Sequence, residues 1–306
     1  MLTARRCILC DAQAVVFLTD RPDYEHGVPT QLTYFRCRRC ELVFASPVPS
    51  ELLAGFYSTY YTHMPTAKQS SRRVLWALLQ QLSAKPDRNL SFASLSVPQT
   101  ARILDYGCGS GLFLRSLVER GYTHLSAYDF DPEAVAHLRD VRIFDDPSKI
   151  EGEIFDVITL NHVIEHLEDP VGTVSRLLST LSAEGFLYIR TPNTASLLAK
   201  TMKGAWRGWE TPRHLFVFNS ANLRMTLERG GGAVTSLATS NDLYPTMMAA
   251  SFSNLLGRSA GRWASRICYV PASWIARVAH VFRADSGEEL VAVVTKGSTG
   301  HESARI

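Results

Sequence analysis

The sequence lacks a long hydrophobic run, a strong net charge and an abundance of cysteine. The longest stretch without a charged residue is 243–257, which is shorter than a membrane-spanning helix and contains Pro245 and Gly257. The first ten residues, MLTARRCILC, hold no apolar segment, so we expect no secretory signal and a cytoplasmic protein. A formal net charge of +3 is too small to indicate nucleic-acid binding by itself.

Cysteine is scarce, yet four of the six cysteines form two C-x-x-C pairs. In a chain without a secretory signal such pairs indicate a metal site rather than disulfides. Four thiolates close a tetrahedral structural zinc site with no open position, so we assign no catalysis to the metal. We predict a zinc-binding unit over residues 1–48, because so small a unit could hardly fold without a metal. The predicted ligands are Cys7, Cys10, Cys37 and Cys40.

The remaining chain is predicted to hold a connector, one large domain and a tail. Residues 49–100 indicate helical segments followed by a polar linker with two prolines. Residues 101–296 alternate strand-like and helix-like segments, which predicts parallel strands with helices on both faces of the sheet. Ligands of such a sheet bind beyond the carboxyl ends of its strands. Residues 297–306 are expected to be a flexible tail.

A glycine-rich loop follows the first strand of this domain. In LDYGCGSG, residues 104–111, glycine alternates with other residues and allows the backbone to turn sharply beside a ligand. The loop leads into a helix, whose first N–H groups favour an anionic group. Asp129, about 20 residues farther on, follows the second strand at the position expected of an acid that binds ribose hydroxyls.

Three consecutive segments, ILDYGCGSGLFL, AYDFDPEAV and FDVITLNHVIEHLEDP, resemble the motifs of class I S-adenosylmethionine-dependent methyltransferases. The resemblance covers residues 100–295 and implies an α/β fold with a Rossmann-like, seven-stranded, mostly parallel sheet, beside the small N-terminal zinc-binding unit. It also implies S-adenosylmethionine as the cofactor. Asp105, Gly107 and Gly109 would hold its methionine end, Asp129 its ribose, and Phe130 and Asp145 its adenine. Asn161 and His162 would lie near the sulfonium, and Cys108 contributes its backbone to the loop while its thiol packs idly.

The segment NHVIEHLEDP also matches the H-x-x-E-H pattern of a class of zinc proteases. That site needs a regular helix and a third distant ligand, but His162 directly follows a strand, so we reject the protease interpretation. We expect residues 161–166 to turn off the strand into a short helix. His166 is then either a packing histidine or the general base beside the transferred methyl group. Glu165 is expected to be a solvated or structural residue.

A narrower resemblance points to the acceptor. Sugar C-methyltransferases combine a zinc-binding unit, a tyrosine-rich segment, a histidine after strand four and an acid–histidine pair after strand five. This chain is similar in its four cysteines, in STYYTH with Tyr61, in His166 and in His214 of WETPRHLFVFN. It departs at Arg213, which stands where the acid is expected and which can hold an anionic acceptor group or form a structural ion pair. The resemblance implies His166 and His214 as base candidates and Tyr61 as a residue that orients the acceptor.

The predicted activity is therefore methyl transfer to oxygen or carbon of a small molecule or saccharide in a biosynthetic pathway. Two alternatives remain: an RNA methyltransferase that uses the zinc unit, disfavoured by the weak charge, and a cofactor-binding scaffold without turnover. The insert 244–283 carries five arginines and no acidic residue, and it is either a helical lid or a peripheral contact with an anionic inner-membrane surface. The oligomeric state stays open.

Overall fold

The computed structural model describes residues 5–19, 23, 32–46, 92–131, 139–257, 271, 274–275, 278 and 285–297. Several predicted features lie outside these residues: Tyr61, predicted to orient the acceptor, most of the connector 49–100, most of the insert beyond residue 257 and nearly all of the predicted tail.

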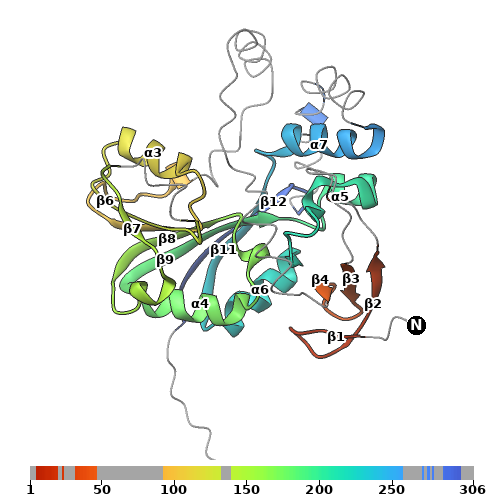
Figure 1. Ribbon diagram of the computed structural model, residues 1–306, viewed down its shortest axis with the longest axis horizontal. Helices are drawn as coiled ribbons and strands as arrows, with labels where there is room; N and C mark the ends of the chain where they lie inside the picture. The colour runs from red at the N-terminus through yellow and green to blue at the C-terminus, as the bar shows by residue number, and fades with distance from the viewer. Residues whose placement is uncertain are drawn as a thin grey trace, which may run out of the picture.

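A seven-stranded sheet forms the centre of the protein (Figure 1), and it confirms the predicted fold class. Its strand order is β11-β12-β9-β8-β5-β6-β7. Only β12 runs antiparallel to its neighbours, and the other pairings are parallel. The strands are β5 (Arg102–Tyr106), β6 (His124–Tyr128), β7 (Arg142–Phe144), β8 (Phe155–Asn161), β9 (Leu181–Pro192), β11 (Gly232–Ser240) and β12 (Glu289–Lys296).

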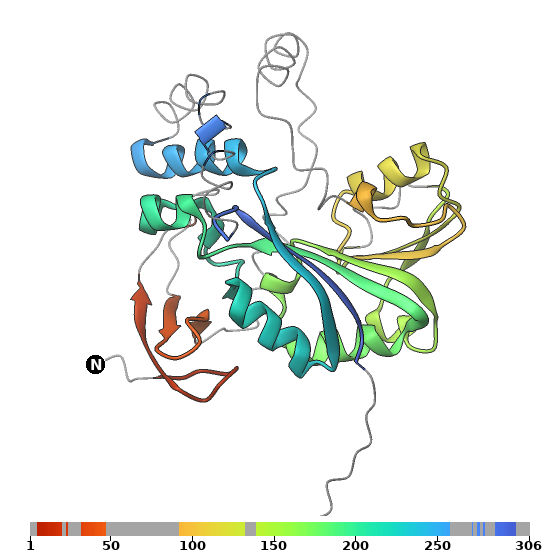
Figure 2. The same ribbon diagram turned by 180° about the vertical axis from the view of Figure 1, so that it is seen from behind.

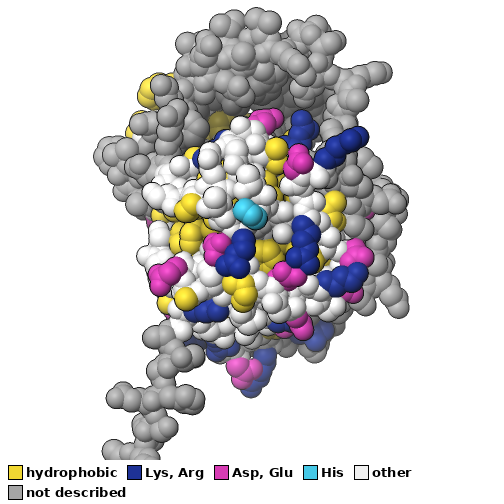
Figure 3. Space-filling model, turned by 90° about the vertical axis from the view of Figure 1, so that its left-hand side faces the viewer, with side chains coloured by type: hydrophobic (Ala, Val, Ile, Leu, Met, Phe, Trp, Pro, Cys, Tyr) yellow, Lys and Arg dark blue, Asp and Glu magenta, His cyan; other side chains and the backbone are white. Residues whose placement is uncertain are grey.

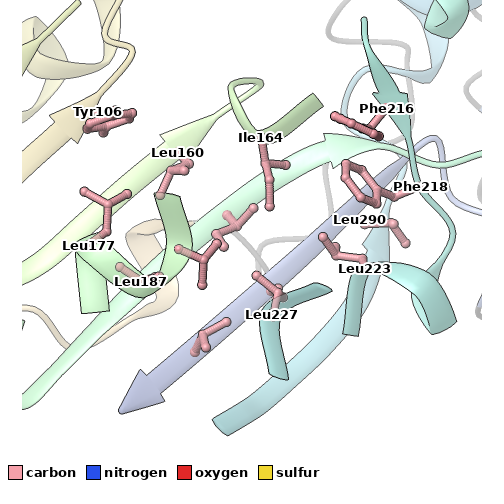
Figure 4. Packing of buried hydrophobic residues seen from close by; sticks show 14 of the residues in the cluster. Tyr106, Leu160, Ile164, Leu177, Leu187, Phe216, Phe218, Leu223, Leu227 and Leu290 are labelled. Atoms are coloured by element: carbon pink, nitrogen blue, oxygen red, sulfur yellow. The ribbon is translucent and has the colours of Figure 1, made fainter. Parts of the chain in front are cut away.

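Helices cover both faces of this sheet. On one face lie α4 (Pro170–Ser179) and α6 (Ser220–Arg229), and on the other lies α3 (Leu112–Glu119), as Figure 1 shows. Side-chain caps begin two of them: Asp169 accepts the N–H of Gly172, and Asn219 accepts that of Asn222. Leucine, isoleucine and phenylalanine side chains from the sheet, α4 and α6 fill the space between them (Figure 4). Burial of this apolar surface is the main stabilising contribution of the layer.

Short helical elements and further helices lie in the segments that connect the strands. They are η2 (Phe92–Ser94), η4 (Pro147–Ile150), η5 (Ile164–His166), α5 (Leu197–Met202), η6 (Lys203–Ala205), η7 (Arg207–Trp209) and α7 (Tyr244–Leu256). The element η5 directly after β8 is the short helix predicted for residues 161–166. No helix within the described ranges has the length and apolar character needed to cross a membrane.

The N-terminal residues form a second, antiparallel sheet beside α5 and α6, remote from α3 in both views (Figures 1 and 2). Its strands are β1 (Arg5–Arg6), β2 (Gln13–Leu18), β3 (Thr33–Cys37) and β4 (Val43–Ser46). A strand from the large domain, β10 (Phe216–Val217), pairs with β4 and completes this sheet. The two parts therefore share a sheet and a continuous apolar core, a junction that the sequence did not predict.

Candidate functional site

A cavity of about 380 Å³ lies at the carboxyl ends of β5, β6 and β8, the edge where the parallel strands were expected to bind a ligand. Residues from three separate loops meet there because these strands are neighbours in the sheet. All but one of the predicted cofactor residues line the cavity, and so does one predicted base. They are Asp105, Gly107, Cys108, Gly109, Asp129, Phe130, Asn161, His162 and His166.

The glycine loop has the backbone geometry that its sequence predicts. Gly107, Gly109 and Gly111 have φ values of 77°, 52° and 68°, which side chains disfavour. A Cβ at Gly107 would lie 2.5 Å from Cγ2 of Val163, so the loop and the segment after β8 are in close contact. The N–H groups of Gly107 and Cys108 donate to the carbonyl of Tyr128. Cys108 is buried, and burial raises the pKa of its thiol, which agrees with an idle side chain.

Asp105 is buried at the end of β5 beneath the loop. It accepts hydrogen bonds from Oγ1 of Thr159 at 2.6 Å and from Nδ2 of Asn161 at 3.3 Å. Burial, helped by the charge of Asp129, raises the pKa of Asp105 to about 6 despite these two hydrogen bonds. A cationic ligand group at this carboxylate would keep it ionised at neutral pH.

Asp129 closes the opposite side of the loop. It is 4% exposed, and its Oδ2 accepts the N–H of Gly109 at 2.7 Å. Phe130 beside it is 53% exposed and offers its ring to the cavity. Asp145 is not brought to this group: it does not line the cavity, and its carboxylate binds Lys149 at 2.6 Å on the surface.

His162 lies in the left-handed backbone region, with φ 57°, and its ring bridges two buried carboxylates. Nδ1 lies 3.2 Å from Glu165 and Nε2 lies 2.8 Å from Glu289. Ionised carboxylates only accept hydrogen bonds, so both ring nitrogens carry protons. Burial opposes this charge, but the two carboxylates outweigh it and raise the pKa of His162 to about 10. Glu165 is fully buried, which rules out the solvated alternative.

His166 and His214 form a second pair, with ring centroids 4.7 Å apart and nearly perpendicular planes. Nδ1 of His166 donates to the carbonyl of Arg213 at 2.9 Å, and Nδ1 of His214 donates to that of Gly208 at 2.8 Å. Burial lowers the pKa of His166, and it lowers that of His214 to about 4. Both rings are therefore neutral at pH 7, but only His166 lines the cavity.

Arg213 forms a buried ion pair within the protein. Its Nη1 and Nη2 donate to the two carboxylate oxygens of Asp23 at 2.8 and 3.3 Å, and its Nε donates to Glu210 at 3.1 Å. The departure at position 213 is compensated by Glu210, whose Oε2 lies 3.5 Å from Nε2 of His214. An acid thus accompanies His214, although from a different position than the resemblance implies.

The four cysteines of the N-terminal sheet converge as predicted. The Sγ atoms of Cys7 and Cys40 lie 3.6 Å apart, and those of Cys10 and Cys37 lie 3.4 Å apart. All four lie within 4.8 Å of one another. A tetrahedral zinc site with zinc–sulfur bonds of about 2.3 Å has sulfur atoms roughly 3.8 Å apart, so this donor set fits zinc. The N–H groups of Arg39 and Cys40 point to Sγ of Cys37, which favours a thiolate there.

A second group of potential metal ligands, Glu165, His166 and His214, also lies within 4.8 Å. The carboxylate oxygens of Glu165 already bind His162 and Thr191, and both Nδ1 atoms of the histidines donate to carbonyls. Ion pairing and ring packing account for this close approach, so we assign no metal to it. His162 does not belong to the group, and the pair expected of a zinc protease is therefore not assembled.

Comparison with known proteins supports the interpretation of this cavity. A family model described as a methyltransferase domain matches residues 78–237, more than half of the 306 residues. The chain belongs to this methyltransferase family. The matched residues include the glycine loop, Asp129 and both histidines that line the cavity.

Among curated proteins, the methyltransferase is similar to two bacterial proteins named ubiquinone biosynthesis O-methyltransferase. The one from Xanthomonas axonopodis pv. citri (strain 306) is 31% identical over 121 residues, which are 35% of this chain and 50% of the relative. The one from Xylella fastidiosa (strain 9a5c) is 32% identical over 117 residues, which are 34% of this chain and 47% of the relative. The methyltransferase thus spans about half the length of these relatives.

Solved structures give more distant likenesses. The cyclopropane synthase MmaA2 from Mycobacterium tuberculosis aligns with 76% of this chain and 88% of its own, at 15% identity and a TM-score of 0.46. The plantazolicin methyltransferase BpumL, solved in complex with a monoazolic desmethylPZN analogue and S-adenosylhomocysteine, aligns with 74% of this chain and 84% of its own, at 20% identity and a TM-score of 0.41.

Proposed function

We propose that this methyltransferase transfers the methyl group of S-adenosylmethionine to an oxygen or carbon atom of a small-molecule or saccharide acceptor. The observation that carries the proposal is the meeting of the glycine loop, buried Asp129 and neutral His166 in one cavity. The name of the curated relatives, which specifies O-methyl transfer, favours oxygen as the acceptor atom.

The residues of the cavity suit the parts of this cofactor. Asp105 is a buried acid that the ammonium of the methionine end would keep ionised, and the backbone of Gly107 and Gly109 admits the ligand without a side chain in the way. Asp129 offers carboxylate oxygens for ribose hydroxyls, and the exposed ring of Phe130 offers a face for the adenine. The bound cofactor supplies an electrophilic methyl group.

His166 is the base in this proposal. Its Nδ1 proton is held by the carbonyl of Arg213, so Nε2 is the nitrogen that accepts the acceptor's proton. His162, held as a cation by Glu165 and Glu289, places a fixed positive charge at the same edge, where it would stabilise the developing negative charge of the acceptor atom. The acceptor atom would form its bond to the methyl carbon as the carbon–sulfur bond breaks, and the acceptor's proton would pass to Nε2 of His166. In this scheme the ring of His214 packs edge-on against the ring of His166 and supports it.

The four-cysteine cluster is proposed to bind one structural zinc ion. Its sulfur separations fit tetrahedral coordination, and four thiolates leave no position for a substrate. The zinc would stabilise the antiparallel sheet of β1 to β4, which is too small to fold readily without a metal.

RNA is the less favoured acceptor. On the face around β6 and β7, basic and acidic side chains alternate (Figure 3). Pairs such as Arg142–Glu153 and Lys149–Asp145 neutralise each other there. RNA binding calls for a continuous basic surface, and the described residues of this face do not provide one.

A peripheral contact with an anionic membrane surface is favoured by a separate observation. Trp274, Ile275 and Val278 are helical, share one face by their spacing, and are each more than half exposed. Leu255 and Leu256 at the end of α7 are exposed as well. The surrounding sequence 244–283 has five arginines and no acid, a composition that suits an anionic lipid surface.

The first test is a calorimetric titration of the protein with S-adenosylhomocysteine. We expect one-to-one binding in the micromolar range, lost in Asp129→Ala and retained in Asp140→Ala, which changes an exposed aspartate. A folded protein that does not bind this ligand would refute the proposal. Methyl transfer from labelled S-adenosylmethionine would then be measured with nucleotide sugars, small hydroxylated aromatic compounds and RNA. Binding without transfer to any of them would favour the scaffold alternative.

A further inference from the structure

The segment after η7 lies between the N-terminal sheet and the candidate base. Leu215 shows this most directly: its N–H donates to the carbonyl of Glu165 at 2.8 Å, while its carbonyl accepts the N–H of Ala45 at 2.9 Å. Directly after it, Phe216 and Val217 form β10 and pair with Phe44 and Val43 of β4. The backbone of this segment is thus both a strand of the N-terminal sheet and the neighbour of the residues after β8.

Two side chains of the N-terminal residues hold the same segment just before β10. Asp23 binds the guanidinium of Arg213 through both carboxylate oxygens, with the two side chains 0% and 3% exposed. The hydroxyl of Tyr34 donates to the carbonyl of His214 at 2.9 Å, and this hydrogen bond is buried. The bidentate pair holds the guanidinium of Arg213 in one geometry, and the hydrogen bond from Tyr34 holds the backbone at the next residue, so together they restrict where the Arg213 carbonyl can lie.

This arrangement determines where the Arg213 carbonyl lies, and that carbonyl orients the ring of His166. The carbonyl of Arg213 accepts the Nδ1 proton of His166 at 2.9 Å. A carbonyl cannot donate, so Nδ1 must carry the proton of the neutral ring and Nε2 must be the basic nitrogen. A shift of the Arg213 carbonyl would remove the contact that selects this tautomer.

We propose that the N-terminal four-cysteine unit positions the catalytic base, with Asp23 and Tyr34 as positioning residues that act through the Arg213 carbonyl on the ring of His166. The inference rests on the proposed function, because it assumes that His166 is the base. It gives the unit a role in catalysis that involves no contact between the unit's cysteines and the substrate.

The cofactor loop is held by different contacts. The N–H groups of Gly107 and Cys108 donate to the Tyr128 carbonyl of β6, and Gly109 donates to Asp129. Weakening the path through Asp23 and Tyr34 therefore leaves the loop supported. Cofactor binding and the state of His166 are expected to respond separately to substitutions in the N-terminal unit.

The test uses the full chain with histidine labelled with ¹⁵N in the ring, in complex with S-adenosylhomocysteine. The ring nitrogen shifts distinguish the Nδ1–H from the Nε2–H tautomer, and His166→Asn identifies the signal among the nine histidines. The variants are Asp23→Asn and Tyr34→Phe. The matched control is Asp11→Asn, which removes the carboxylate of an exposed pair with Arg6 in the same unit.

We expect both variants to bind S-adenosylhomocysteine with an affinity within about threefold of that of the wild type. In both, the Nδ1–H signal of His166 should be replaced by the signals of a tautomer mixture. Asp11→Asn should change neither the affinity nor the tautomer. Tyr34→Phe removes one hydroxyl and decides the matter if Asp23→Asn does not fold. An unchanged Nδ1–H tautomer in folded Tyr34→Phe and Asp23→Asn overturns the inference. If the wild type does not bind S-adenosylhomocysteine, the proposed function itself is refuted, so a failure of the inference and a failure of the proposed function give different results.

Discussion

Acidification is expected to weaken the binding of S-adenosylhomocysteine, because Asp105 must be ionised to hold the ammonium group of the ligand. Burial and the charge of Asp129 raise the pKa of Asp105 to about 6. A carboxyl group with a raised pKa is ionised above that value and becomes neutral as the pH falls through it. The affinity for S-adenosylhomocysteine should therefore be highest at neutral pH and decline below about pH 6.

The magnitude follows from the ionised fraction. A group with a pKa near 6 is about 97% ionised at about pH 7.5 and about 9% ionised at about pH 5, so the affinity should fall about tenfold between these conditions. The structure supplies no other cation at the Asp105 carboxylate in its described contacts, only the hydroxyl of Thr159 and the amide of Asn161. In this prediction the ammonium of the ligand would be the charge that keeps Asp105 ionised in the complex.

The assay is calorimetry at the two pH values, with two variants as controls. Asp105→Asn should bind more weakly at neutral pH and show no further loss on acidification. His166→Asn should keep the tenfold dependence, because S-adenosylhomocysteine carries no sulfonium charge that a protonated His166 could repel. An affinity that is the same at both pH values in the wild type would refute the assignment of Asp105 to the methionine end.

Three further predictions concern other parts of the chain. Gly107→Ala should weaken S-adenosylhomocysteine binding roughly 100-fold in calorimetry, because the added Cβ is strained at positive φ and clashes with Val163. The control Gly152→Ala, at a positive-φ glycine with open space around it, should leave the affinity unchanged. Equal effects of the two substitutions on the affinity would contradict the argument. Cys40→Ser should lose the bound zinc in elemental analysis and lower the thermal midpoint by roughly 5 to 10 °C, and full zinc content in this variant would exclude the site. Trp274→Ser should lower the affinity for phosphatidylglycerol vesicles about tenfold in a sedimentation assay, whereas Ile154→Ser, at an exposed position next to β8, should leave it unchanged. Equal binding of the wild type to phosphatidylcholine vesicles would refute the electrostatic part of the proposal.

Local rules explain which parts of the fold could be predicted. The strands of the large sheet alternate with helices along the chain, which implies parallel strands, and all of them but β12 run in the same direction. The glycine loop was predictable because positive φ angles and a helix start leave few other residues at 107 and 109. Asp129 followed from its offset, and the short helix η5 from the position of His162 directly after a strand.

The supporting charges could not be predicted in this way. Glu289 binds His162 across 127 residues, and Asp23 binds Arg213 across 190 residues. Each is a single acid with no repeated spacing to mark it, so nothing in the sequence distinguishes it from a solvated surface acid. Glu210 was passed over for the same reason, although the resemblance to sugar C-methyltransferases had called for an acid near His214.

The sequence by itself determined the alternation of strands and helices, the glycine loop, the position of the cysteine pairs and the candidate histidines, because each depends on residues close together in the chain. Only the tertiary structure decided what each of these histidines contacts. His162 bridges two buried carboxylates, which raise its pKa. Burial lowers the pKa of His166, whose Nδ1 donates to the carbonyl of Arg213, and the ring of His214 packs against it. These states differ although the residue type is the same, because protonation depends on desolvation and on partners that only the folded chain brings within hydrogen-bonding distance.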